Sequence, residues 1–296
     1  MPFSVRLATP ADLEQICGLL EHGFFPAAQK ILIADIRKRF DDGTCISFVA
    51  SADDTIVGHA TIKQDSPDKA YFGSLVVHEA YRHNGIANAL SQARVAHLQI
   101  NNFQGSAQSD AVTLHPYSQL QLYAVGFHAV RILLGGAPDH GAGPETTVGF
   151  SRFFSPSGLW KPEVTTLSLY MPSEHREIAV ETLRPFGTVA FQETAVDILG
   201  DKIRSIAASE DIRKPGMIYA VRLYEPAAPA EIAFLRNKGY IVAGFYPVIK
   251  DGKISAVAHM YLASDVALHK EKINVIPSAQ KLFEFVWEQY AQLRNK

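Results

Sequence analysis

The stretch at residues 75–90 constrains the fold more than any other part of the chain, because it changes character abruptly. Leu75 to Val77 is an apolar run typical of a strand, and a helical stripe of apolar residues follows the turn. Between them lies the pattern Arg82-x-x-Gly85-x-Ala87. Small residues in such a turn leave backbone N–H groups uncovered, and a new helix contributes roughly half a positive charge at its N-terminus. The stretch therefore predicts a strand–turn–helix unit with an anion site suited to a pyrophosphate.

These residues resemble motif A of the GCN5-related N-acetyltransferases (GNAT), which reads Val-x-Pro-x-x-Arg/Gln-x-x-Gly-x-Gly/Ala. Val77, Arg82, Gly85 and Ala87 match the motif, and Glu79 stands where the family prefers Pro. The resemblance implies that the strand end and the loop bind acetyl-CoA as co-substrate, and it implies no metal. The cofactor-binding residues implied in this way are Leu75, Val76, Val77, Arg82, His83, Asn84, Gly85, Ile86 and Ala87.

The order of the predicted elements is similar to that of the acetyltransferase fold. Apolar periodicity predicts strands at residues 4–8, 46–50, 55–63 and 69–77, and helices after Thr9 and at 27–40. After the motif helix we expect a strand at 111–115, a helix at 117–125 and two strands at 127–135 and 146–154. The expected fold is therefore α/β (α+β), with a mixed, mostly antiparallel sheet flanked by helices. The loop at 136–145 is either a lid over the acceptor or a hairpin connection.

A Ser-, Pro- and Gly-rich segment at 155–162 marks the expected domain boundary. We expect an acyl-CoA-binding catalytic GNAT domain at residues 1–155 and a smaller, degenerate and non-catalytic GNAT-like domain at 163–296. A helix followed by Gly and an aromatic residue occurs twice, at Gly126 and at Gly239, which suggests an internal repeat. The second half is predicted to contain strands at 164–170, 217–223, 241–249 and 254–262, and helices at 173–183, 228–237 and 278–293.

The resemblance also suggests catalytic residues. The family polarises the acyl carbonyl with a backbone N–H at a bulge in the strand before motif A, and a tyrosine protonates the departing thiolate. Tyr123 is the candidate acid, although it lies three residues before Gly126, where the family uses four and where Leu122 stands. One residue of slip rotates a helical side chain by about 100°. Tyr117 is the fallback acid.

The general base is left open between side chains and water. His115 is the first choice, because an imidazole titrates near working pH and the residue is expected at the end of the strand beside the splayed one. Glu79 is the second candidate, with the alternative that it only begins the turn. His59 and His78 fit better as packed or exposed strand histidines than as bases. A water relay would leave no residue to find.

Bulk composition excludes several classes of protein. The 296 residues are 47% hydrophobic and 20% charged, with a formal net charge of −2, so the chain has no electrostatic footprint for nucleic acid or an anionic membrane. The two cysteines have no metal-binding spacing and suggest no disulfide framework. With no signal-peptide pattern and no apolar run of about 18 residues, a cytoplasmic location is the expectation.

Together these features predict an N-acetyltransferase that moves an acetyl group from acetyl-CoA to a primary amine of a small molecule. The alternative is a catalytically silent sensor that binds acyl-CoA and docks a partner protein. A third reading is a different acyl donor, either a longer acyl-CoA or a carrier-protein thioester. The oligomeric state stays open between a monomer and a homodimer.

Overall fold

A computed structural model gives the arrangement of the chain, and it describes residues 2–23, 26–137, 145–155, 165–193, 218–262 and 267–294. By internal packing the chain divides into two units. The first comprises residues 1–110, 120–127 and 152–160, and the second comprises residues 111–119, 128–151 and 161–296. The segment at 155–162, where we expected the boundary, lies almost wholly outside the described residues, as does most of the loop at 136–145.

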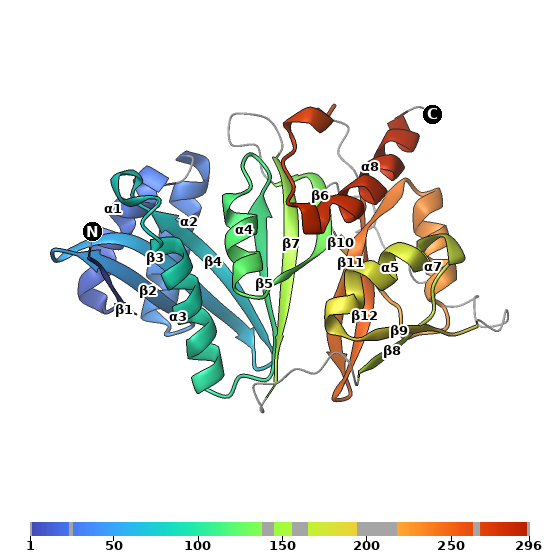
Figure 1. Ribbon diagram of the computed structural model, residues 1–296, viewed down its shortest axis with the longest axis horizontal. Helices are drawn as coiled ribbons and strands as arrows, with labels where there is room; N and C mark the ends of the chain where they lie inside the picture. Colours follow the sequence, from blue (N-terminus) through green and yellow to red (C-terminus); the bar gives the residue numbers. More distant parts are fainter. Residues whose placement is uncertain are drawn as a thin grey trace. The chain divides into compact units, whose positions relative to one another are not determined.

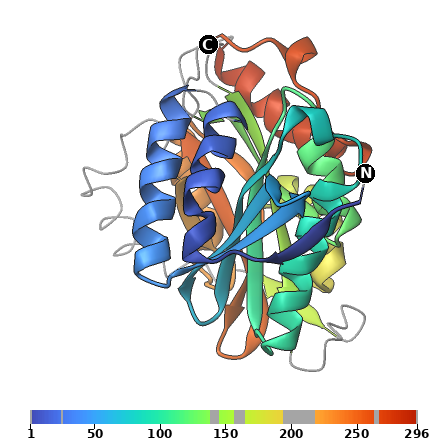
Figure 2. The ribbon, with the colours of Figure 1, turned by 90° about the vertical axis from the view of Figure 1, so that its left-hand side faces the viewer.

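The sheet of the first unit is antiparallel except for its last pair (Figure 1). Its strands lie in the order β1 (Ser4–Leu7), β2 (Cys45–Ala52), β3 (Thr55–Ser66), β4 (Lys69–Val77) and β5 (Gly105–Val112). Strands β4 and β5 are parallel and are joined by helix α3 (Ile86–Ile100), since a parallel pair needs a crossover connection. Helices α1 (Leu13–Gly23) and α2 (Pro26–Asp41) cover the opposite face of the sheet from α3 (Figure 2).

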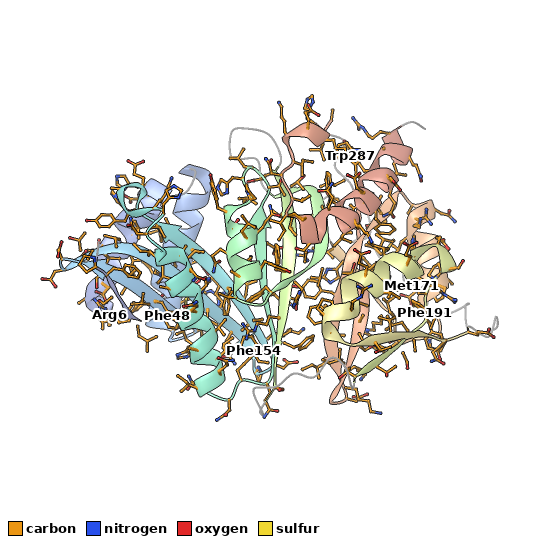
Figure 3. The ribbon with its side chains drawn as sticks, in the orientation of Figure 1. Arg6, Phe48, Phe154, Met171, Phe191 and Trp287 are labelled. Carbon is orange, nitrogen blue, oxygen red and sulfur yellow. The ribbon has the colours of Figure 1, made fainter. Side chains whose placement is uncertain are left out.

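Apolar side chains fill the space on both faces of this sheet. On the α1 and α2 side, the buried cluster consists of Ile16, Leu19, Leu20, Ile36, Val49, Ile56 and Val76. On the α3 side, Phe48 meets His97 edge to face at a ring separation of 5.6 Å (Figure 3). The sheet is therefore covered on both sides, and its backbone is accessible only along its edges and at its strand ends.

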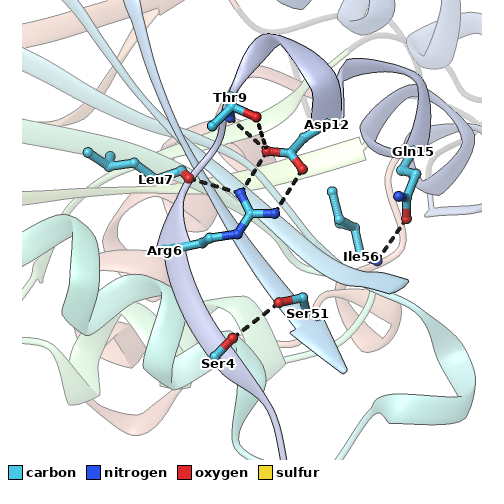
Figure 4. Close-up of polar contacts among 8 residues, drawn as sticks. All are labelled: Ser4, Arg6, Leu7, Thr9, Asp12, Gln15, Ser51 and Ile56. Carbon is cyan, nitrogen blue, oxygen red and sulfur yellow. Dashed lines mark hydrogen bonds and ion pairs between the residues drawn. The ribbon is translucent and has the colours of Figure 1, made fainter. Parts of the chain in front are cut away.

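A polar cluster fixes the start of the chain to this sheet (Figure 4). Arg6 donates to both carboxylate oxygens of Asp12 at 2.7 and 2.8 Å, and Asp12 also accepts from the backbone N–H and the hydroxyl of Thr9. These donors keep the pKa of Asp12 well below its usual range, with the bond from Arg6 as the largest cause. The helix start predicted at Thr9 is confirmed, although it begins as a single 3₁₀ turn before α1.

The second unit is built mainly on an antiparallel sheet whose strand order is β7-β6-β11-β12-β10. The bounds of these strands are β6 (His128–Ala137), β7 (Glu145–Phe154), β10 (Ile218–Arg222), β11 (Tyr240–Lys250) and β12 (Lys253–Leu262). Helices α5 (Arg176–Leu183), α7 (Ala228–Asn237) and α8 (Gln280–Arg294) pack against β11. A separate parallel pair, β8 (Thr166–Leu169) and β9 (Thr188–Phe191), is joined by α5.

Strand β11 makes two unusual contacts in the second unit, one with the backbone of β6 and one with a side chain of α8. Gly244 of β11 pairs with Arg131 of β6, and a Cβ at Gly244 would lie 2.1 Å from the Val130 carbonyl oxygen, so no other residue fits there. Beside it β11 shifts register, and the buried Gln289 side chain both accepts from the Val242 N–H at 3.0 Å and donates to the Val242 carbonyl at 3.1 Å. Gln289 of α8 thereby takes the place of strand-to-strand hydrogen bonds at Val242.

Most predicted elements are confirmed within three residues at either end, but the strand expected at 111–115 was wrong. The strand is β5, at Gly105–Val112, and the chain bends after it. Its sequence is dominated by small and polar residues, which hid it from hydrophobic periodicity. Gly105 must be glycine, because a Cβ there would lie 2.0 Å from the Asp68 carbonyl oxygen. The strand β9 was also missed, because its four residues are too few to form a periodic pattern.

Helix α4 (Tyr117–Ala124) is followed by a turn at Gly126, and α7 (Ala228–Asn237) is followed by a turn at Gly239. Both glycines have positive φ angles, 79° and 88°, as expected for helix ends of this kind. Each is followed by a hairpin: β6 and β7 after α4, and β11 and β12 after α7. The repeated sequence signature is therefore matched by a repeated order of elements.

Candidate active site

The loop between β4 and α3 is shaped by two residues in the left-handed region of backbone conformation. His83 has φ of 65° and Gly85 has φ of 80°. A Cβ built on Gly85 would meet nothing within 4 Å, so glycine is required here for its backbone conformation and the space in front of it is open. The predicted turn is confirmed, and it leaves room for a ligand directly at the start of α3.

Side chains within the loop hold its own backbone. His78 caps the 3₁₀ turn at Glu79–Tyr81, with Nδ1 accepting from the Ala80 N–H at 3.3 Å. Arg82 donates from Nε to the Val77 carbonyl at 3.3 Å. Asn84 donates to the carbonyls of Tyr81 and Arg82 at 3.2 and 3.1 Å. These hydrogen bonds hold the loop in shape, and none of them involves a backbone N–H at the start of α3.

Helix α3 begins without a side-chain cap, because Gly85 is its N-cap residue. The first intrahelical bond runs from the Ala89 N–H to the Gly85 carbonyl at 3.0 Å, so the amides before Ala89 have no partner within the helix. Helix α3 is 15 residues long, and its dipole adds to the attraction of these amides for an anion. The residues at this end, Gly85, Ile86 and Ala87, are among those expected to bind the cofactor.

Strand β4 separates from β5 after Tyr71 and then contains a bulge. His59 pairs with Val76 and Thr61 with Gly73, so two residues of β4, Ser74 and Leu75, lie opposite a single residue of β3. Ser74 has φ of 50°, which is rare for any residue other than glycine. On the other edge, pairing with β5 continues only to Tyr71, opposite Gln108. The end of β4 thus presents an unpaired edge.

The direction of the amides along this edge follows from one hydrogen bond. The His78 N–H donates to the Val57 carbonyl of β3 at 2.9 Å. Because successive amides of a regular strand point to opposite edges, the amide of Val77 points away from β3, toward the side that β5 has left. The resemblance to the family implied a bulge in the strand before motif A but did not point to Ser74, since a backbone bulge leaves no side-chain signature.

A small pocket of about 100 Å³ lies beside the end of β4. It is lined by Leu19, His22, Gly23, Val76, Val77, His78, Glu79 and Arg82. Gly23 keeps this pocket close to the strand, because a Cβ there would lie 2.1 Å from a methyl group of Val76. The pocket brings Glu79 together with His22, a residue of α1 that sequence reasoning missed. A histidine in the last turn of a helix gives no signal beyond favourable helix electrostatics.

The candidate acid lies on α4, where the one-residue slip has a visible effect. Leu122 is only 3% exposed and packs in the core, whereas Tyr123 is 49% exposed. The backbone carbonyl of Tyr123 accepts from the Gly126 N–H at 3.0 Å, in the turn that ends the helix. The tyrosine therefore projects from a different face of α4 than the residue at the family's tyrosine position.

The other candidate residues fall into separate places. His115 belongs to the second unit, three residues after the end of β5, and its ring lies 5.1 Å from that of Tyr117. Asn274 holds the segment before it: its backbone N–H donates to the Thr113 carbonyl, and its side chain donates to the Leu114 carbonyl. His59 is fully buried, as expected for a packed strand histidine, so it cannot touch an acceptor.

Two kinds of feature are absent from the described residues. No cluster of three or more His, Cys, Asp and Glu side chains among them has a metal-binding arrangement. Likewise, none of the helices in the described ranges is both long and apolar enough to span a bilayer.

Comparison with solved structures finds many of similar fold. The ribosomal-protein-S18-alanine N-acetyltransferase of Escherichia coli is 14% identical with a TM-score of 0.46, covering 52% of this chain and 95% of its own. Phosphinothricin acetyltransferase of Sinorhizobium meliloti is 18% identical with a TM-score of 0.45, covering 52% and 90%. NAA60 of Arabidopsis thaliana is 20% identical with a TM-score of 0.43, covering 51% and 98%. At these identities and scores the likeness says nothing about activity.

A search of the curated proteins finds no match to this sequence. The family model described as "Acetyltransferase (GNAT) family" matches residues 13–127. That range contains the bulged β4, the loop with Arg82 and Gly85, and helices α3 and α4. The mixed, mostly antiparallel sheet flanked by helices agrees with the fold expected of this family. Residues 13–127 are therefore an acetyltransferase domain of the GNAT family.

Proposed function

We propose that this chain transfers an acetyl group from acetyl-CoA to a primary amine of a small molecule. The observation that carries the proposal is the continuity of the unpaired edge of β4 with the uncapped start of α3. An extended thioester with a pyrophosphate at its far end fits such a track. Its amide-bearing arm would bond to the backbone at 75–77, and its phosphates would meet the amides at the start of the helix.

The reaction needs a donor to the acyl oxygen, a base and an acid. The amine nitrogen forms a bond to the thioester carbon, and the carbonyl oxygen takes the electron pair, facing the Leu75 N–H. When the C–O double bond re-forms, the C–S bond breaks and sulfur leaves as a thiolate. Tyr123 would give this thiolate a proton, and Glu79 or a water at the pocket rim would accept the proton of the amine. His115, the first choice from the sequence, becomes the alternative base, because it belongs to the second unit.

We also propose that the first domain, residues 1–155, is catalytic and that residues 163–296 form a degenerate copy without catalytic function. Support comes from the repeated order of a helix, a glycine and a hairpin in the two halves. The location would be cytoplasmic, with no nucleic acid or membrane partner. The acceptor would be a small amine rather than a protein lysine.

The position of Tyr123 favours a second candidate function, an acyl-CoA sensor without turnover. The residue at the family's tyrosine position, Leu122, is apolar and buried. A sensor would bind acetyl-CoA yet release no thiol.

One experiment separates the two functions. Acetyl-CoA is titrated calorimetrically into the purified protein, and thiol release is then followed with a panel of amino acids and polyamines. Turnover with at least one amine is expected, and Tyr123→Phe should slow it about 10- to 100-fold while leaving stability unchanged, because the side chain is half exposed. Loss of turnover in Tyr117→Phe instead would move the acid to that residue. Binding of acetyl-CoA without thiol release for any amine would favour the sensor function over the enzyme.

A further inference from the structure

A cavity of about 440 Å³ lies within the second unit, between helices α7 and α8. Its volume is in the range of pockets that hold small molecules. The last turns of α8, at residues 289–293, form one wall. Another wall is a single face of α7, whose lining residues recur every three or four positions: Pro229, Ile232, Ala233 and Arg236. The cavity shares no lining residue with the acetyl-CoA site proposed above, so its use needs a separate explanation.

Buried contacts hold the walls of this cavity in place. Ile232 of α7 is fully buried and Ile241 of β11 is 1% exposed, and these two residues form its apolar part. The Gln289 side chain, which bonds to the backbone of Val242, also donates to the Phe285 carbonyl at 3.1 Å. Helix α8 is therefore fixed to β11 at the cavity, and the site is formed before any ligand enters it.

Two charged side chains of opposite sign line the cavity, and its other lining residues are uncharged at pH 7. Arg236 of α7 donates from Nη1 to Oε1 of Glu174 at 3.2 Å, and Glu174 belongs to the 3₁₀ turn before α5. The two side chains are 37% and 56% exposed, so their ion pair contributes little to stability and separates easily. Burial lowers the pKa of the adjacent His175 to about 4, so this ring is neutral at pH 7 and adds no charge.

This arrangement of charges selects a class of ligand. An anion would face Glu174 and a cation would face Arg236, whereas a zwitterion gives each of them a partner of opposite sign. The guanidinium can donate two parallel hydrogen bonds to a ligand carboxylate, and Glu174 can accept from a ligand ammonium group. Because Arg236 and Glu174 are in contact, the two charges of the ligand must lie close together, as they do on either side of the α-carbon of an amino acid. Ile232 and Ile241 then favour an apolar side chain.

We propose that this cavity binds a free α-amino acid with an apolar side chain, held by Arg236 and Glu174. The inference goes beyond the proposed function and does not depend on it. It gives the second half of the chain a binding role that needs no catalytic group. The sequence gave no hint of this site, since its two charged residues are 62 positions apart.

The test titrates L-leucine and L-phenylalanine calorimetrically into the purified protein without acetyl-CoA. Binding of at least one of them is expected. The N-acetyl derivative of the amino acid that binds lacks the positive charge, and its amide lacks the negative one. Each derivative should bind at least about 10-fold more weakly, because it loses a charged hydrogen-bonding partner on the protein. No binding of either amino acid, or equal binding of the amino acid and both derivatives, would overturn the inference.

Variants of the ion pair locate the bound amino acid. Arg236→Gln and Glu174→Gln should each weaken binding at least about 10-fold with little change in melting temperature, because the pair is exposed. Arg222→Gln is the matched control and should leave the Kd unchanged. Arg222 also pairs with a glutamate of the second unit, Glu225 at 3.1 Å, but neither residue lines the cavity.

Two further results would overturn the inference. An unchanged Kd in Arg236→Gln would mean that the amino acid binds elsewhere, for example at the amine site proposed for the first unit. An equal weakening in Arg222→Gln would mean that the loss of charge acts without regard to position. Neither result bears on the binding of acetyl-CoA by the wild type, which tests the proposed function separately.

Discussion

The described part of the chain contains two parallel strand–helix–strand crossovers, and only the first of these has the features proposed above for a thioester site. The crossover β4–α3–β5 pairs its strands up to Tyr71 and then opens, whereas β8 and β9 stay paired through all four of their residues. The first contains a bulge with a positive φ at Ser74, and β8 contains none. A shared topology therefore does not make a site.

The starts of the two helices differ in the same way. Helix α3 begins at Gly85 with open space in front of it. Helix α5 follows a 3₁₀ turn, and its N-cap residue, His175, is buried against the Phe285 ring at 5.5 Å. An amphipathic helix can thus be placed after a parallel strand with its N-terminus either open to a ligand or closed by the core. The difference lies in one glycine and in how far the strands stay paired.

The largest expected effect comes from closing the open helix start. Gly85→Glu places a negative charge in the space before α3, at a strained φ, and should weaken acetyl-CoA binding at least about 100-fold, or roughly 3 kcal/mol. Calorimetric titration measures this. Gly43→Glu is the matched control, because Gly43 also has a positive φ, 66°, and open space around it, yet lies in the turn before β2.

A glutamate placed before α5 tests whether the second crossover also binds acetyl-CoA. Ser173 is exposed and precedes α5, so Ser173→Glu should leave the Kd for acetyl-CoA unchanged. A weakening comparable with that of Gly85→Glu would mean that the second crossover also binds the cofactor. The distinction between an open and a closed helix start would then be wrong.

A smaller effect is expected from the bulge. Ser74→Val puts a β-branched residue at φ of 50° and should lower the free energy of unfolding by about 1–3 kcal/mol. Ser168 is an exposed residue within the regular strand β8, so Ser168→Val should stay within about 0.5 kcal/mol of the wild type. Urea unfolding of the two variants compares them. Equal losses would show that the conformation of Ser74 is not what matters.

The smallest effect distinguishes two buried histidines. Burial lowers the pKa of His175 to about 4, and both of its ring nitrogens lack hydrogen-bond partners among the described residues. Since the unfolded pKa is about 6.5, the unfolded state binds more protons between pH 4 and 6.5, and stability falls as the pH falls through that window. His175→Phe should reduce this slope by up to about 1.4 kcal/mol per pH unit.

The matched change at His59 should behave differently at neutral pH. Its pKa of about 4 predicts the same loss of slope in His59→Phe. However, His59 Nε2 lies 3.4 Å from the Ser47 hydroxyl, so His59→Phe should destabilise the protein at pH 7 by about 1 kcal/mol, whereas His175→Phe should not. Equal effects at pH 7 would mean that the contact of His59 with the Ser47 hydroxyl is unimportant.

The sequence by itself determined the elements whose signals are local. The hairpin turn at Asp251 and Gly252 and the helix end at Gly126 are fixed by backbone conformations that few residues adopt, and all three residues have the expected positive φ. The loop at Gly85 belongs to the same class. These features depend on neighbours in the chain, so the residue types are sufficient to predict them.

Only the tertiary structure decided where the chemistry can occur. The small residues of β5 form a strand because they fit between other elements. The bulge at Ser74 exists because β3 and β4 pair out of register, and Arg94 of α3 donates to the Gly73 carbonyl beside this bulge. None of these is encoded in a periodic pattern. A site made from backbone groups and from residues far apart in the chain is set by packing, because the partners of each group are brought together only in the folded protein.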